Sequence, residues 1–336
     1  MARYFSLLLL SLVLLPSSAG ALTGITSVDV TAFSVFDGVN YAGHDDSASG
    51  APLGASRDVQ QSLEGRTSTV VKVRASAASD AGQVHAAAST EFPGVFYCSP
   101  GPFCNGVGTV KGSARAAATQ GATDIMFSGT GPITTNVTLD LSGSVQRIFD
   151  WIDGTTHQAY LNAQIPSATV QIDFNLSQVR AGNCEGTPCT LNQHLTSGLL
   201  TLESHYDGTT SLISSGFTNA PSSWANGIYH LQSQNFSVLP NLPVSMFFEI
   251  LVDSAEQYSH SGGDHILSGL DFGHTFGLTT AGPVFSLGGG ETVNSSSLQL
   301  ASNVFTPVPE PGTALLVALG AGLLARARRG CVARPS

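Results

Sequence analysis

The chain has 336 residues, of which 42% are hydrophobic and only 11% are charged, and its formal net charge at pH 7 is −10. Without Arg3 and the last 29 residues, segment 22–307 keeps 8 Lys and Arg against 22 Asp and Glu, a net charge of −14. A surface of this sign excludes nucleic acid and anionic lipid as expected partners, because both bind to basic patches.

The N-terminal residues 1–21 have the pattern of a secretory signal peptide. Arg3 precedes an uncharged, leucine-rich run over 4–15, and small residues follow at 17–21. A basic start, a short apolar stretch and an A-x-A-like end direct a chain to export and to signal peptidase, with cleavage here expected after Ala21. The alternative is an anchor that stays in the membrane. It is disfavoured because a spanning helix needs about 20 apolar residues.

Segment 22–307 contains many stretches in which apolar and polar residues alternate. The stretches 70–77 and 83–92 each place apolar residues on one face, and the turn-forming residues 79–82 between them predict a β-hairpin. Three later apolar faces consist of Ile133, Val137, Leu139 and Leu141, of Val170, Ile172, Phe174 and Leu176, and of Met246, Phe248, Ile250 and Val252. Further strands are expected at 25–36, 199–206, 209–217, 227–238, 269–279 and 296–305.

These strands predict an all-β ectodomain over 22–307, an antiparallel β-sandwich of jelly-roll type. Two segments, 56–65 and 145–154, have short stretches that suit a surface turn or a short helical element. No repeat with a fixed period of 20–50 residues occurs, which disfavours a β-helix or a propeller.

Four cysteines lie in pairs around Gly- and Pro-containing turns. Cys98 and Cys104 flank one turn, and Cys184 and Cys189 flank another. In an oxidising compartment each pair is expected to close as a local disulfide, although four cysteines allow three pairings. Cys331 follows the apolar part of the tail and has no partner in this scheme.

Metal-binding patterns are weak, and no metal or cofactor is expected. The strongest candidates are His260, Asp264 and His265, because imidazoles and a carboxylate on a Gly-rich loop suit Zn²⁺. His274 follows further along the chain. A weaker alternative is a Ca²⁺ site built from loop oxygens, for which the candidates are His44, Asp45, Asp46, Asp150 and Asp153.

Catalytic patterns are also weak, and no catalytic residue is assigned. The chain has no H-E-x-x-H, G-x-S-x-G or EF-hand pattern. A glycosidase would need two carboxylates at a defined separation, and the candidates are Glu64, Glu91, Glu203 and Glu249. Aromatic rings that stack on sugars are a further alternative to core packing, with candidates Trp151, Tyr206, Trp224 and Tyr229.

The C-terminal segment 308–336 has three parts. Val308, Pro309, Glu310 and Pro311 precede an uncharged run over 314–325, and Arg326, Arg328 and Arg329 follow it. The run predicts a short transmembrane helix, which at 1.5 Å per residue covers roughly 18–20 Å of a hydrocarbon core near 30 Å. Arginines after the helix would stay cytoplasmic and leave the ectodomain outside.

This ordered combination resembles the PEP-CTERM sorting signal of Gram-negative bacteria that make exopolysaccharide. The resemblance covers about 25 residues of 336, and the chain extends past the arginines, where family members often stop. It implies that exosortase, a membrane transpeptidase or protease, recognises the tail. It also implies processing near Pro309, Glu310 and Pro311, followed by release or attachment at the cell surface.

The two ends together predict an exported protein. The chain would be anchored transiently in the inner membrane with its ectodomain in the periplasm, and would then reach the outer surface or the extracellular matrix. A non-enzymatic role linked to exopolysaccharide and biofilm is favoured. Two alternatives stay open, a carbohydrate-binding module and a secreted hydrolase that acts on polysaccharide through loop carboxylates or the His260 and His265 region.

Overall fold

The structure is a computed structural model, and it describes residues 23–34, 40–48, 53–62, 70–93, 110–150, 166–184, 187–205, 207–258 and 265–306. These residues form strands, turns and bends, with no helix among them. The chain divides into Met1–Phe305, which holds every described strand, and Thr306–Ser336. The predicted signal peptide (1–21) and the predicted sorting segment with its short helix (308–336) lie outside the described residues.

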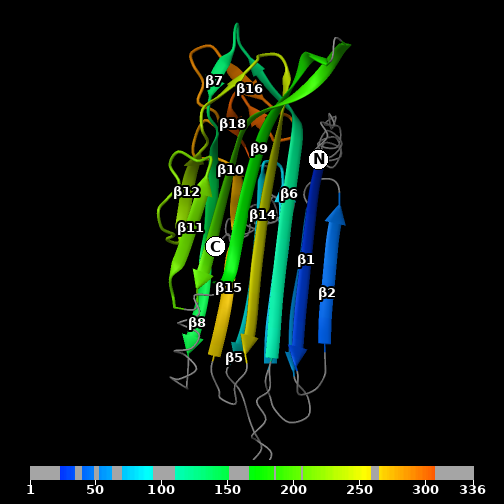
Figure 1. The fold of residues 1–336 in the computed structure, drawn as a ribbon, viewed down its shortest axis with the longest axis vertical. Coiled ribbons are helices and arrows are strands. Elements are labelled where there is room, and N and C mark those ends of the chain that lie inside the picture. Colours follow the sequence, from blue (N-terminus) through cyan, green and yellow to red (C-terminus); the bar gives the residue numbers. More distant parts are fainter. Residues whose placement is uncertain are drawn as a thin grey trace, which may run out of the picture. The chain divides into compact units, whose positions relative to one another are not determined.

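Two large sheets make up the fold, and their strand pairs are antiparallel. The eight-stranded sheet has the order β11 (Thr210–Ser215), β10 (Thr187–His205), β9 (Pro166–Cys184), β14 (Pro243–Tyr258), β6 (Val110–Ser128), β1 (Thr23–Ser34) and β2 (Asn40–Ala48), and β16 (Thr292–Asn294) pairs with β6. Figure 1 shows β9, β14, β6 and β1 side by side.

The six-stranded sheet has the order β12 (Gly227–Gln232), β8 (Thr138–Asp150), β15 (His265–Leu278), β5 (Gln83–Pro93), β4 (Val70–Asp80) and β3 (Leu53–Ser62). Two small pairs complete the described part, β7 (Ile133–Thr135) with β13 (Phe236–Val238) and β17 (Leu300–Ala301) with β18 (Val304–Phe305).

The two large sheets pack face to face. Strand β5 contacts β6 and β14, and β4 contacts β1 and β6. The ring of Phe248 on β14 meets that of Phe276 on β15 edge to face, with centroids 6.0 Å apart. Because both inner faces are apolar, this contact buries one continuous core. The predicted antiparallel β-sandwich is confirmed.

The alternating pattern of the sequence marks the buried faces correctly. The predicted hairpin is present as β4 and β5, and the three later apolar faces are buried in the core. Two local predictions are wrong. Residues 53–62 form β3, which pairs with β4, and Val145–Asp150 continues β8 beside β15. Pairing with a neighbouring strand supplies backbone hydrogen bonds that override weak local propensity.

The turn after β11 depends on Gly216. Its φ of +77° lies in the left-handed region, and a Cβ there would lie 2.1 Å from the carbonyl oxygen of Ser197. The Gly216 carbonyl accepts a hydrogen bond from the Gln234 N–H at 3.1 Å. Glycine therefore lets the chain leave β11 in close contact with β10 and reach the end of β12.

We expect Gly216→Ala to lower the free energy of unfolding by more than about 1 kcal/mol, because alanine at positive φ is strained and its Cβ meets backbone. Thermal unfolding followed by circular dichroism measures the change. Gly131→Ala is the matched control, since a Cβ there has nothing within 4 Å. Equal losses in the two variants would contradict this account of Gly216.

Candidate functional site

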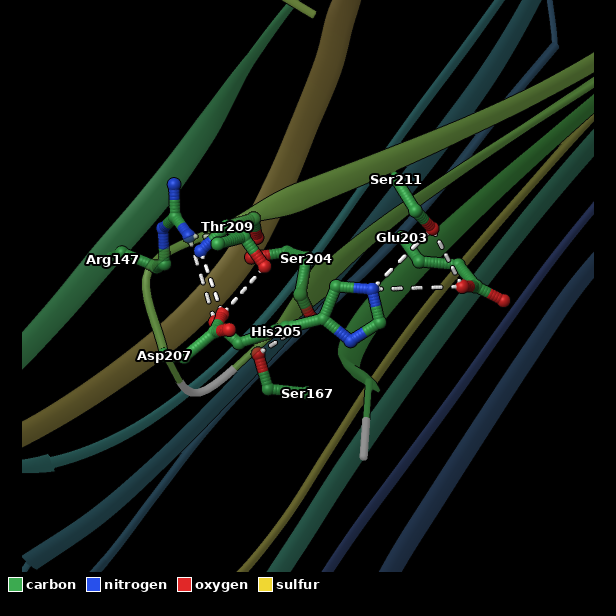
Figure 2. A network of polar contacts seen from close by, with 8 residues as sticks. All are labelled: Arg147, Ser167, Glu203, Ser204, His205, Asp207, Thr209 and Ser211. Atoms are coloured by element: carbon green, nitrogen blue, oxygen red, sulfur yellow. Dashed lines mark hydrogen bonds and ion pairs between the residues drawn. The ribbon is translucent and has the colours of Figure 1, made fainter. Parts of the chain in front are cut away.

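A polar cluster joins the end of β10 to the start of β11 (Figure 2). Ser211 Oγ donates a hydrogen bond to Glu203 Oε2 at 2.8 Å. His205 Nε2 lies 3.3 Å from Ser211 Oγ and 3.6 Å from Glu203 Oε2. Glu203 and Ser211 are directly opposite each other in the β10–β11 ladder, so the sheet register itself places the carboxylate beside the hydroxyl. We call Glu203, His205 and Ser211 the hairpin cluster.

The hairpin cluster contains the residue types of a hydrolytic triad, but its geometry differs from one. In a triad the carboxylate holds Nδ1 of the histidine, and Nε2 takes the serine proton. Here both the serine and the carboxylate lie at Nε2. Nδ1 of His205 is buried without a hydrogen-bond partner in the described structure. Because Ser211 donates its hydrogen bond to Glu203 and not to His205, the arrangement joins β10 to β11 without the serine-to-histidine hydrogen bond of a triad.

The turn between β10 and β11 is held from both sides. Asp207 Oδ1 accepts hydrogen bonds from the Thr209 N–H at 2.8 Å and the Thr209 hydroxyl at 2.5 Å. These hydrogen bonds lower the pKa of the Asp207 carboxyl below its ordinary value. Arg147 on β8 donates to the Thr209 carbonyl at 3.0 Å (Figure 2). Arg147 therefore links the six-stranded sheet to this turn of the eight-stranded sheet.

Three carboxylates lie on the outer face of the eight-stranded sheet, two of them directly opposite each other and the third four residues further along β14. Glu249 on β14 is directly opposite Asp173 on β9, and Asp253 on β14 is opposite Arg115 on β6. Burial raises the pKa of Glu249, the negative charge of Asp173 raises it further, and Arg115 opposes the shift. Burial also raises the pKa of Asp173. We call Asp173, Glu249 and Asp253 the carboxylate row.

The carboxylate row has two kinds of neighbour. Burial raises the pKa of Asp253 while Arg115 lowers it, and Arg115 Nε lies 3.7 Å from Asp253 Oδ1. Glu249 and Asp173, by contrast, face each other as like charges. Directly opposed residues have Cβ atoms about 4.5–5.5 Å apart, so one of this pair takes up a proton more readily than an isolated carboxyl.

Two further aspartates have structural partners. Asp124 on β6 accepts hydrogen bonds from the Ser295 hydroxyl at 2.6 Å, the Ser296 hydroxyl at 2.8 Å and the Ser297 N–H at 3.0 Å. Burial would raise the pKa of Asp124, but these hydrogen bonds outweigh it and the pKa is lowered. Asp140 on β8 binds His230 Nδ1 at 2.6 Å and the Thr280 N–H at 3.1 Å. Both carboxylates tie separate strands together.

The predicted metal residues are not brought together within the described part of the chain. No group of three His, Cys, Asp or Glu residues that could hold a metal ion occurs there. His260, Asp264 and Asp153 lie outside the described residues, as do the side chains of His44, Asp45, Asp46, Asp150, His265 and His274. The Zn²⁺ and Ca²⁺ alternatives therefore stay predictions.

The predicted glycosidase carboxylates are spread over both sheets. Glu91 is on β5 and pairs with Lys72 at 3.2 Å. Glu203 and Glu249 are both on the eight-stranded sheet, but two strand spacings and four residues of register separate them. That offset is about 16 Å, too far for a glycosidase pair, which needs roughly 5–9.5 Å. Glu64 lies outside the described residues.

The aromatic candidates that the structure describes pack inward. The Trp224 ring lies 4.7 Å from the Tyr229 ring and 5.3 Å from the Phe272 ring, and Phe272 is fully buried. These rings cover the core, and they form no strip on a sheet face. Trp151 and Tyr206 lie outside the described residues.

The structure describes the side chain of only one of the four paired cysteines, Cys189. Cys189 on β10 is disulfide-bonded, and Thr187 pairs with Cys184 across the hairpin. The Cys184–Cys189 pairing itself stays a prediction, because the Cys184 side chain lies outside the described part. Cys98 and Cys104 also lie outside it.

Sequence reasoning did not single out Asp173, Asp124, Asp140, Arg147 or Asp207. Alternation does put Asp173 and Glu249 on the polar faces of their strands. The missing information is the register of β9 against β14, because that register alone makes the two carboxylates neighbours.

No helix among the described residues has the length and apolar character needed to cross a membrane. Comparison of the chain with protein-family models, with curated proteins and with solved structures gives no match.

The raised pKa of Glu249 predicts the sign of a pH effect. A carboxyl with a raised folded-state pKa costs stability above that pKa, and the cost disappears as pH falls toward its ordinary value of 4.5. We expect Glu249→Gln to be more stable than wild type at pH 7 and the difference to shrink below about pH 5. Urea unfolding at several pH values measures this. Asp173→Asn should act in the same direction, and lower stability of Glu249→Gln at pH 7 would contradict the assignment.

Asp124 predicts the opposite sign. A lowered folded-state pKa contributes stability above the ordinary value of 3.8, and that stability is lost as pH falls through the folded pKa. We expect Asp124→Asn to lower the free energy of unfolding by about 1–2 kcal/mol at pH 7. The loss should lie near the lower of these values, because the carboxylate is partly exposed and solvent weakens its interactions. The loss should vanish under acid conditions. A loss that is independent of pH would refute the role of the charge.

Proposed function

We propose that the protein is an exported, exosortase-sorted component of the outer surface or the extracellular matrix of a Gram-negative bacterium, with no catalytic activity of its own. The single observation that carries the proposal is the order of the two ends, a signal-peptide pattern over 1–21 and the three-part segment 308–336. Signal peptidase acts on the first end and exosortase on the second. The inner membrane holds the chain between these steps, with the ectodomain in the periplasm.

The ectodomain spans residues 22–307 and, on this proposal, is a sandwich of jelly-roll type. Three connections support this finer description, because β5 to β6, β8 to β9 and β14 to β15 each pass from one sheet to the other. In both sheets the last of these connections lies between the other two, as β5-β15-β8 and β6-β14-β9. Nested crossings of this kind are how a jelly roll is wound. The proposal also includes a short hydrophobic helix over 314–325.

A non-enzymatic role is supported by how the described polar groups are used. Ser211 donates a hydrogen bond to Glu203, Asp140 binds His230 on β12 and the Thr280 N–H after β15, and Asp124 binds three successive residues. All of these groups form their hydrogen bonds within the fold. Such a domain suits a durable surface or matrix protein linked to exopolysaccharide and biofilm.

A second candidate function, a hydrolase that acts on polysaccharide, is favoured by one observation. Glu249 and Asp173 are directly opposite each other on neighbouring strands, so their Cβ atoms are about 4.5–5.5 Å apart, and the carboxyl groups of retaining glycosidases are about 5–5.5 Å apart. The raised pKa of Glu249 suits a general acid. If instead this face only binds glycan, it is the carbohydrate-binding alternative.

The sorting proposal predicts a change in mass and location. We expect the wild-type protein to lose the residues beyond about Glu310 and to leave the inner membrane. The triple variant Pro309→Ala, Glu310→Ala, Pro311→Ala should keep them and stay in the membrane fraction. Intact-mass spectrometry and fractionation of the native protein measure both. Pro335→Ala is the matched control outside the motif, and it should behave as wild type.

If the wild type and the triple variant both keep the tail, the sorting proposal is wrong. The hydrolase candidate is tested separately, by release of reducing sugar from the host's exopolysaccharide. Activity that disappears in both Glu249→Gln and Asp173→Asn would replace the non-enzymatic proposal. Binding without sugar release would support the carbohydrate-binding alternative.

A further inference from the structure

Three of the fully buried polar side chains without hydrogen-bond partners lie on β1, β4 and β6, and a fourth, Ser268, is on β15. Thr26 on β1, Ser79 on β4 and Gln120 on β6 are fully buried, with no exposed surface. The Thr26 Oγ1, the Ser79 Oγ and both amide atoms of Gln120 have no hydrogen-bond partner in the described structure. Buried polar groups are nearly always hydrogen-bonded, so a group of unpartnered ones calls for a partner from outside the chain.

Thr26, Ser79 and Gln120 lie at the same height along the strands, in the interior between the two sheets. In the eight-stranded sheet Gln120 pairs with Gly24 and Phe248, and Thr26 pairs with Ala118 two residues away on the same face. Diagonal neighbours of this kind lie about 7–8 Å apart or less. Gln120 and Thr26 are therefore adjacent on the inner face.

Ser79 lies opposite them on the other sheet. The Phe248 ring contacts the Phe276 ring, Phe276 pairs with Val84, and Val84 pairs with Ser79. This path leads from the level of Gln120 across the core to Ser79. Strand β4 also contacts both β1 and β6.

A second contact between the sheets gives the same alignment of their strands. Ser254 on β14 and Thr90 on β5 are hydrogen-bonded, with the Ser254 and Thr90 hydroxyl oxygens 3.3 Å apart. From Ser254 to Phe248 is six residues along β14, and from Thr90 to Val84 is six residues along β5. Because both sheets advance equally from one contact to the other, Ser79 and Gln120 fall at matching heights.

The polar groups of Thr26, Ser79 and Gln120, with their apolar surroundings, suit a small uncharged ligand. The primary amide of Gln120 and the hydroxyls of Thr26 and Ser79 can each donate and accept hydrogen bonds. Their neighbours on the inner faces are Ala77, Ala118, Ala122, Val84 and Phe248, which are buried and uncharged. An ion would have no counter-charge there, whereas water needs only two to four polar partners in a buried site.

We propose that Thr26, Ser79 and Gln120 form an internal hydration site that binds one or more long-lived water molecules between the two sheets. The inference does not rest on the proposed function, because it concerns the interior and not the exported ends. The water completes hydrogen bonds that the chain leaves open and links β1, β6 and β4 across the core.

Magnetic relaxation dispersion of the water nuclei detects such molecules, because they exchange more slowly than the protein tumbles. We expect Gln120→Met and Thr26→Val each to lose part of the dispersion amplitude that the wild type shows. Ser233→Ala is the matched control, because this buried hydroxyl already accepts from the Val137 N–H at 3.1 Å and donates to the Gln234 carbonyl at 2.8 Å. It should lower the melting temperature and keep the amplitude.

The direction in which Gln120→Met changes the melting temperature is an independent test. If water satisfies Gln120, Gln120→Met leaves the water with fewer partners, and the melting temperature falls. If the interior is dry, the same change removes an unsatisfied amide, and the melting temperature rises. Unchanged dispersion amplitude in both variants, or a raised melting temperature in Gln120→Met, overturns the proposal. Thr26→Val preserves side-chain shape, so the test remains decisive if Gln120→Met fails to fold.

Discussion

The contact between the inner faces of the two large sheets is the constraint on which the rest of the structure depends. Along the centre of that contact the chain uses small side chains, with Ala75 and Ala77 on β4 facing Ala116 and Ala118 on β6. Small residues on both faces allow long strands to pack closely without interruption. Every second residue then points to the interior, and the other half of each strand carries the charged side chains and most of the polar ones.

This division explains why strands could be predicted from the sequence and the candidate site could not. A period of two is a local property, so the inward faces of β9 and β14 are readable from their own residues. The pairing of Glu249 with Asp173 depends on which strands become neighbours and in what register, and 75 residues of chain separate the two. Local periodicity contains no such information.

The same limit accounts for the wrong local predictions. The segment 56–65 has Val59 and Leu63 four residues apart, a spacing that suits one helical turn, but its neighbour in space is β4. A strand beside another strand gains a ladder of hydrogen bonds, which a single isolated helical turn cannot match. Tertiary pairing therefore decides the conformation of segments whose own preference is weak.

The charges of the ectodomain follow from its two polar outer faces. Lys72 pairs with Glu91, Arg115 with Asp253, and Arg147 donates to backbone carbonyls of the β10–β11 turn. These three cations have partners within the fold, and the carboxylate row has three carboxylates beside the single described cation Arg115. An acidic polymer would be repelled by the negative charge of this surface, and few cations in the described part are free to compensate for the loss of its hydration. On the proposed matrix role, a neutral, hydroxyl-rich polysaccharide would avoid this repulsion, because its hydroxyls can donate hydrogen bonds to carboxylates and exchange them with amides and hydroxyls.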